Sequence, residues 1–420
     1  PSLYCRSNVC IDGILMKNNK SLYIGVMSGT SVDAIDLAIV SFDNNKISVL
    51  ATSETKFCPL LRQQVLTLCE RQSANLVELG QITQHLSKSY AEAINALLVR
   101  NKLSSSDIQA IGCHGQTVCH HPVGEHPFSM QLVNSSLIAA MTNITTICDF
   151  RSMDIALNGQ GAPLIPAFHQ FLLSLNSFNN TKFTGAQSAA FLNIGGMANI
   201  TLVTPPTMQN KQIGIHKSTI GFDTGPGNAL IDLWALNKFG LAFDSNGDIA
   251  ASGTVNEDLL TIMLSDPYFK KSPPKSTGRE YFNERWLEHQ LTLVNNKHAQ
   301  MTLTNEDIMA TLVQLTAQTI CNDLNQYANL TPNNKDECLN ILWAFGGGCR
   351  NHSLMDAIKH LLPDWQIKDT SELGIESDYM EAIAFAWLAY CRINLLPSTL
   401  PSVTGANNAA ISGTLTLPPS

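Results

Sequence analysis

The chain lacks features that mark several other protein classes. No segment approaches the ~20 consecutive apolar residues that a membrane-spanning helix needs, so we expect no contact with a membrane. Residues 1–20 have no continuous apolar core of the kind a signal peptide carries. We expect them to be a poorly ordered N-terminal extension. The chain has 26 basic residues against 34 acidic ones, a net charge of −8, and therefore no broad basic face for nucleic acid.

The eleven cysteines form no Cys-x-x-Cys pair, the usual spacing of a thiolate metal site. Their number is odd, and several, such as Cys69, Cys148 and Cys391, lie inside apolar runs. Small buried thiols explain that placement. We therefore expect reduced cysteines and a cytoplasmic protein.

The order of the expected elements is sheet first, then helix, and it occurs twice. With 420 residues the chain is too long for a single core and predicts two or three domains. Strand-like runs at 22–27, 35–42 and 46–52 precede a helical pattern of apolar residues over 76–97. A strand pair at 190–203 restarts the order, and a helix follows Pro226. The class is α/β.

Further elements are predicted along the chain. Strands are expected at 108–113, 144–149 and 339–345, with a breaker at 159–163 that marks a passage between domains. A loop rich in Pro, Lys and Ser covers 271–278. Thr304 with Asp307 has the spacing of a capping box and opens a long helix. The last helix is expected over about 378–394, before a tail with little to form a core.

Three glycine-bearing turns suggest a site for a polyphosphate. They lie in the segments 22–40, 190–203 and 344–351. Glycine turns expose backbone N–H groups that can donate to phosphate oxygens without a side chain in the way. The first turn alone is better explained as an ordinary polar turn, and the alternative for the triple glycine at 346–348 is a strand-to-helix turn without a ligand. Because the motif is repeated about half the chain apart, we favour ATP held between two related halves.

The motifs together resemble a known family. They are the segments 25–36, 112–117, 149–154, 159–164, 193–199, 221–228, 275–280 and 346–348. Their order and spacing are similar to those of the 1,6-anhydro-N-acetylmuramic acid kinases, and the resemblance covers nearly all of the chain from Leu22 to the tail. So many motifs in one order are far more specific than any single glycine loop.

The resemblance implies a two-lobed actin-like ATPase fold, each lobe a mixed, ribonuclease H-like sheet with flanking helices. Lobe I would cover residues 21–150 and lobe II 151–394, with 395–420 packing on lobe I. The implied reaction uses ATP, Mg²⁺ and water to open the anhydro-sugar and phosphorylate O6, giving N-acetylmuramic acid 6-phosphate and ADP in cell-wall recycling. The oligomeric state stays open, with a homodimer as one option.

The family's ATP-binding residues map onto the glycine turns. The matching positions are Gly29, Thr30, Ser31, Val32, Asp33, Ala34, Ile35, Asp36, Gly195, Gly196, Gly346, Gly347 and Gly348. Asp33 is the candidate for holding magnesium through water, since Mg²⁺ accepts one carboxylate with phosphates and water as its remaining ligands.

Asp223 matches the family's catalytic aspartate and would activate the attacking water. From loop statistics alone, a cap on the helix near Pro226 is the more probable role. Glu381 resembles a glutamate beside the sugar, although an acid in a first helical turn is equally ordinary.

The candidates for sugar binding are His114, Gln116, Thr117, Arg151 and Arg279. Arg151 suits the lactyl carboxylate because a guanidinium can bind a carboxylate with two hydrogen bonds. Alternatively, it ties together the loop from Asp149 to Asp154. A lone histidine after a strand, such as His114, is more often structural.

Three positions depart from the family pattern, because Ala34, Asn158 and Ala382 stand where glycine is usual. If position 34 needed a positive φ, alanine would be strained there by about 1 kcal/mol. Two rival functions share the phosphate turns: another sugar or acetate-type kinase, and an actin- or Hsp70-like nucleotide switch. Sugar-dependent ATP turnover separates the kinases from the switch.

Overall fold

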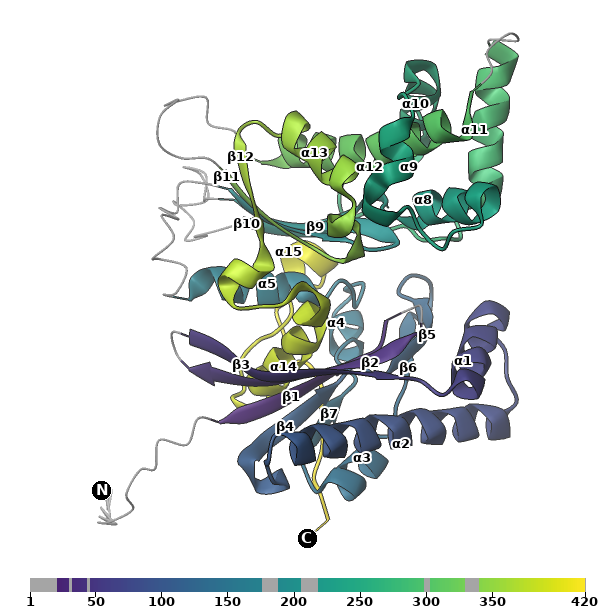
Figure 1. Cartoon of the computed structure of the whole chain (residues 1–420). Coiled ribbons are helices and arrows are strands. Elements are labelled where there is room, and N and C mark those ends of the chain that lie inside the picture. The colour runs from purple at the N-terminus through teal and green to yellow at the C-terminus, as the bar shows by residue number, and fades with distance from the viewer. Residues whose placement is uncertain are drawn as a thin grey trace, which may run out of the picture.

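The computed structural model describes residues 21–29, 32–43, 46–175, 188–204, 218–297, 303–328 and 340–419. The expected N-terminal extension at 1–20 lies outside this described part. Two central sheets, one in each half of the molecule, organise the fold, and helices cover them (Figure 1).

The first sheet has the strand order β13-β7-β4-β1-β2-β3. Its strands are β1 (Leu22–Met27), β2 (Ala34–Asp43), β3 (Lys46–Lys56), β4 (Ile108–Cys113), β7 (Thr146–Cys148) and β13 (Thr414–Thr416). The first three strands are antiparallel neighbours, whereas β4 pairs parallel with β1, and β7 pairs parallel with β4. A separate hairpin consists of β5 (Gln116–His121) and β6 (Phe128–Leu132).

The second sheet repeats this topology in the order β10-β9-β8-β11-β12. Its strands are β8 (Ala189–Ile194), β9 (Met197–Thr204), β10 (Ser218–Pro226), β11 (Asn340–Phe345) and β12 (Trp365–Asp369). Again the first three are antiparallel, and β11 and β12 continue in parallel. Two mixed sheets with one strand order confirm the expected two-lobed α/β fold.

Helices complete both lobes. Around the first sheet lie α1 (Pro59–Arg71), α2 (Leu76–Arg100), α3 (Ser135–Thr142) and the short η1 (Ser105–Asp107). Between the sheets lie α4 (Ser152–Ala156), α5 (Ile165–Ser174), η6 (Thr370–Leu373), η7 (Ser377–Tyr379), α14 (Met380–Ile393) and α15 (Pro401–Thr404) (Figure 1). The second lobe holds α8 (Ala229–Trp234), η2 (Ala235–Phe239), η3 (Ser245–Gly247), α9 (Asp248–Ser252), α10 (Glu257–Leu264), η4 (Pro267–Lys270), α11 (Glu284–Lys297), α12 (Asn305–Tyr327), η5 (Gly347–Arg350) and α13 (His352–Leu361). Among the described helices, none is long and apolar enough to span a bilayer.

The capping box predicted at Thr304 is confirmed. The Asp307 backbone N–H donates to Thr304 Oγ1 at 3.1 Å, and the Thr304 N–H donates to Asp307 Oδ2 at 3.3 Å. These bonds satisfy N–H groups that the start of α12 leaves without helical partners. They fix where α12 begins, and its buried face then crosses the second lobe.

A shared core joins the two sheets through α5 and α14. It contains Tyr23 of β1, Phe191 of β8 and Phe385 of α14, all at most 2% exposed. The sequence predicts the last helix within lobe II, whereas α14 packs on β1, β2 and β4 of the first sheet. Gly25 explains the fit: a Cβ there would overlap the Ala382 carbonyl oxygen, so only glycine lets the helix approach this closely.

The C-terminal tail contacts both lobes. β13 pairs with β7 in the first sheet, while α15 packs on β10 in the second. The buried Asp154 side chain links the tail to the passage between the lobes. Its Oδ2 accepts from the Gly161 N–H and its Oδ1 accepts from the Thr404 hydroxyl, each at 2.7 Å.

Candidate functional site

The turn between β1 and β2 carries the first expected phosphate site. It closes with a hydrogen bond of 3.1 Å from the Val32 N–H to the Gly29 carbonyl oxygen, and Val32 has a φ of 53°. A β-branched residue in this region is strained. Ala34 begins β2 and is not among the described residues with positive φ, so the conditional strain at 34 does not arise. Thr30 and Ser31 lie outside the described residues.

Side chains of the first lobe hold this turn. Gln116 accepts from the Ser28 hydroxyl at 2.8 Å and donates to the Gly29 carbonyl oxygen at 3.3 Å. Gln116, expected at the sugar, therefore supports the turn. The exposed Asp33 accepts two bonds from Arg62 of α1 at one carboxylate oxygen, at 2.7 and 3.0 Å.

The second and third glycine turns lie together where β8 and β11, two interior strands of the second sheet, end. The Gly195 carbonyl accepts from the Asn228 N–H at 2.8 Å, and the Gly196 carbonyl accepts from the N–H groups of 227 and 229. A Cβ on Gly346 would lie 2.8 Å from the Ile194 carbonyl oxygen, which places the two turns in contact. At Gly347, in contrast, an added Cβ would meet no atom within 4 Å.

Asp223 lies on β10 at an irregularity of the ladder. The register against β9 shifts between Asp223 and Gly225, and such bulges re-aim side chains. Asp223 Oδ2 accepts from the Thr277 N–H at 3.0 Å. α8 is capped at Asn228 without a side-chain bond, so Asp223 is not a helix cap. Burial raises the pKa of Asp223 to about 6, and the Thr277 N–H bond opposes that rise.

A buried ion pair lies beside Asp223, and the sequence motifs did not reveal it. Lys275 Nζ lies 3.0 and 3.1 Å from the two carboxylate oxygens of Asp323 on α12, and both side chains are at most 7% exposed. The Lys275 carbonyl oxygen also accepts from the Asp223 backbone N–H at 3.2 Å. An indication was present in the sequence, because Asp323 interrupts the apolar stripe of α12 between Ile320 and Leu324.

Two of the residues expected at the sugar, Arg151 and His114, lie in direct contact. Arg151 Nη1 donates to the Gly161 carbonyl oxygen and Nη2 donates to His114 Nε2, both at 2.8 Å. An arginine only donates, so the His114 proton resides on Nδ1. Burial and the nearby guanidinium lower the pKa of His114 far below its usual value, which keeps it neutral. Arg151 Nε is buried and has no hydrogen-bond partner within the described part of the chain.

Glu381, at the start of α14, lies near Arg151. Burial raises the pKa of Glu381, and the Arg151 charge opposes that rise. Asp36 of β2 is close as well, because its pKa is raised to about 6 by burial and by the charges of Glu54, Glu381 and Asp378. Glu381 therefore lies between the Arg151 charge and the carboxyl groups around Asp36.

The last two sugar candidates differ in their surroundings. The Arg279 side chain is exposed beside the second glycine turn, and a Cβ on Gly196 would lie 3.5 Å from its Nη2. Burial raises the pKa of Asp232 to about 6, and the charge of Arg279 opposes that rise. Thr117 Oγ1 accepts from Gln131 Nε2 at 3.2 Å. Arg279 therefore lies with the second glycine turn, and Thr117 with the β5–β6 hairpin.

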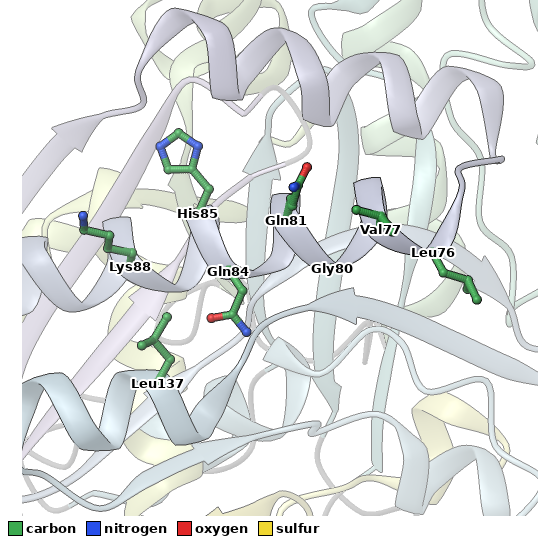
Figure 2. A pocket seen from close by; sticks show the side chains of 8 residues that line it. All are labelled: Leu76, Val77, Gly80, Gln81, Gln84, His85, Lys88 and Leu137. Atoms are coloured by element: carbon green, nitrogen blue, oxygen red, sulfur yellow. The ribbon is translucent and has the colours of Figure 1, made fainter.

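Two further features concern metals and pockets. Within the described ranges, no three His, Cys, Asp or Glu side chains are grouped as a metal site would require. A groove of about 620 Å³ runs along α2 and α3 (Figure 2). It is lined by Leu76, Val77, Gly80, Gln81, Gln84, His85, Lys88 and Leu137. None of the expected site residues lines this groove.

Comparison of the sequence with known proteins identifies the family. The family model described as anhydro-N-acetylmuramic acid kinase matches residues 21–418. The chain belongs to the anhydro-N-acetylmuramic acid kinase family. It is 44% identical to the protein of that name from Pasteurella multocida, over 95% of this chain and 98% of the relative. It is 43% identical to the Haemophilus influenzae protein of the same name, over 94% and 97%.

Membership confirms the resemblance drawn from the motifs. As a member of a kinase family over residues 21–418, the chain is a phosphotransferase. The roles of single residues depend on the geometry given above.

Proposed function

We propose that the chain opens the 1,6-anhydro bridge of anhydro-N-acetylmuramic acid with water and transfers the γ-phosphoryl group of ATP to O6. The products are N-acetylmuramic acid 6-phosphate and ADP, in cytoplasmic recycling of cell-wall fragments. One observation carries the proposal: a half-buried carboxylate, Asp223, is held by the Thr277 N–H on a bulged strand in the same sheet as the two glycine turns.

Asp223 is the general base of this reaction. It takes a proton from a water molecule as the water oxygen bonds to the anomeric carbon C1. The C1–O6 bond breaks, and O6 bonds to the γ-phosphorus of ATP while ADP leaves. The pKa of about 6 keeps Asp223 ionised at neutral pH yet basic enough to accept the proton. Thr277 Oγ1, buried without a partner among the described residues, adds a hydroxyl beside this carboxylate.

The glycine turns suit the phosphates of ATP. A Cβ on Gly195 would meet nothing nearer than the Met197 carbonyl oxygen at 3.6 Å, and one on Gly347 would meet nothing within 4 Å. Packing within the protein therefore does not require glycine at either position. Backbone N–H groups on an open turn can approach phosphate oxygens closely. Gly29, Gly196 and Gly346 complete the turns, and Arg279 beside Gly196 adds a positive charge.

Mg²⁺ would be held near the first turn. Asp33 is exposed there, and both of the Arg62 bonds described above go to its Oδ1. A single carboxylate fits Mg²⁺, which keeps several waters and binds phosphate oxygens. When bound, the ion would neutralise charge on the phosphates during transfer.

The sugar would lie against the group around Arg151. A buried donor without a partner, such as Arg151 Nε, is rare in folded proteins and fits an acceptor supplied by a ligand. We assign the lactyl carboxylate to this atom. Glu381 and the neutral His114 would contact the ring hydroxyls or the N-acetyl group, and Gln116 acts indirectly by supporting the first turn.

Replacement of Asp223 by Asn tests the base. The amide keeps an oxygen for the Thr277 N–H but cannot take the proton, so we expect turnover to fall by about 10²–10⁴ with ATP binding nearly intact. Wild-type enzyme in ¹⁸O-labelled water should place the label on the C1 hydroxyl and none in the phosphoester. Turnover within a few-fold of wild type in a folded variant, or label in the phosphoester, contradicts the proposal.

A further inference from the structure

The Lys275–Asp323 ion pair is unusual because both of its charges are buried. Lys275 is 7% exposed and Asp323 is 5% exposed. Removing two charges from water is costly, and a buried pair often gives no net stability compared with apolar residues. Such a pair needs a reason other than stability.

The pair is built into the support of Asp223. The Lys275 carbonyl oxygen accepts from the Asp223 N–H. Two residues further along the chain, the Thr277 N–H donates to Asp223 Oδ2. Asp323 fastens the Lys275 side chain to α12, which packs on β10 (Figure 1). The loop that holds Asp223 by backbone and side chain is thus fixed to a long helix by one ion pair.

Two aromatic rings lie close to the Lys275 ammonium group. Lys275 Nζ lies 5.2 Å from the ring centre of Phe222 and 5.5 Å from that of Tyr268. The Tyr268 hydroxyl donates to the Asp223 carbonyl oxygen at 2.7 Å. Both aromatic residues are therefore also tied to Asp223, Tyr268 by this hydrogen bond and Phe222 as its neighbour in the chain.

We propose that Lys275 is a positioning residue for the base, and that with Asp323 it holds the Thr277 N–H on Asp223 and keeps a positive charge beside this carboxylate. This inference rests on the proposed role of Asp223. It extends that role by assigning a purpose to a buried charge pair that touches neither ATP nor sugar in the scheme above.

The charges that face Asp223 act in opposite directions. After burial and the Thr277 bond, the exposed Glu280 raises the pKa of Asp223 and Lys275 lowers it. The Tyr268 hydroxyl, from η4, bonds to the backbone of Asp223, and Asp323, from α12, faces Lys275. In a plot of kcat/KM against pH, the acidic limb is the range in which activity rises as the base becomes ionised. Loss of the Lys275 charge should move this limb to higher pH, and loss of the Glu280 charge should move it to lower pH.

The experiment measures kcat/KM against pH for paired variants. K275M/D323L replaces the pair with apolar side chains, and K275Q/D323N replaces it with neutral groups that can still hydrogen-bond. Neither leaves an unpaired buried charge. In both variants we expect the midpoint of the acidic limb to move to higher pH by at least about 0.3 unit, which halves kcat/KM at a given pH on that limb. We also expect a lower kcat and little change in KM for ATP. E280Q is the matched control and should shift the limb downwards.

A merely structural pair would lower the melting temperature and leave the limb unmoved, which would overturn the proposal. Failure of both paired variants to fold would overturn it too, since the pair would then serve folding. The residual activity of Asp223→Asn separates the two levels of the argument. If the acidic limb near pH 6 persists in Asp223→Asn, Asp223 is not the base. If the limb disappears in Asp223→Asn but keeps its position in the paired Lys275 and Asp323 variants, only the role of Lys275 is refuted.

Discussion

Arg151→Lys gives the sharpest test of how the sugar is recognised. The guanidinium donates to Gly161 and to His114, and its Nε remains for a ligand. Lysine keeps the positive charge near Glu381 but has one nitrogen on a flexible stem, so it cannot make all of these contacts. The change therefore removes the proposed lactyl contact while largely preserving the electrostatics.

Two separate magnitudes follow from this geometry. Loss of a charge-assisted hydrogen bond costs about 1.5–3 kcal/mol, which corresponds to a rise of roughly 10- to 100-fold in KM for the anhydromuramyl sugar. The Gly161 carbonyl or His114 Nε2 also loses its donor, so we expect the free energy of unfolding to fall by about 1–3 kcal/mol. The second effect is independent of substrate, and the first is not.

The assay compares kcat/KM for the anhydromuramyl sugar and for an analogue without the lactyl acid. Urea unfolding gives the stability of the same preparations. Thr404→Val serves as the control, because it removes the hydrogen bond to Asp154, in the passage between the lobes, without changing the Arg151 guanidinium. An equal proportional loss on both sugars would refute the receptor role and leave Arg151 as the tie between His114 and Gly161.

The remaining predictions concern stability. Thr404→Val removes a buried bond to Asp154 Oδ1, so unfolding in urea should show a loss of about 1–3 kcal/mol; an unchanged midpoint would show that the tail is not held there. Asp36 has a folded pKa of about 6, above its unfolded value, so its carboxyl disfavours the folded state as pH rises from about 4 to 6. Because Asp36 is partly exposed, we expect Asp36→Asn to be more stable than wild type by only about 1–2 kcal/mol at pH 7.5 and to show no gain at pH 4. Equal differences at the two pH values would contradict this explanation.

The sequence by itself determined the fold class and the glycine turns. Alternating apolar patterns, glycine turns and the Thr304 capping box are local, since each depends on residues a few positions apart. The predicted strands at 22–27, 108–113 and 190–203 and the helix from 305 therefore appear nearly where expected. The motifs also sufficed for the family, because their order along the chain is itself sequence information.

Only the tertiary structure decided what the side chains of the site contact. Burial and charge contacts arise from segments far apart in the chain, and no local pattern encodes their distances. The Arg151 contact to His114 spans 37 positions, and the Lys275 contact to Asp323 spans 48. The sequence analysis assigned α14 to the second lobe for the same reason. Nothing in the local pattern shows that the missing side chain of Gly25 in β1 lets the α14 backbone at Ala382 pack against the first sheet. Packing between distant segments sets the pKa of Asp223, and with it the chemistry that the motif alone left undecided.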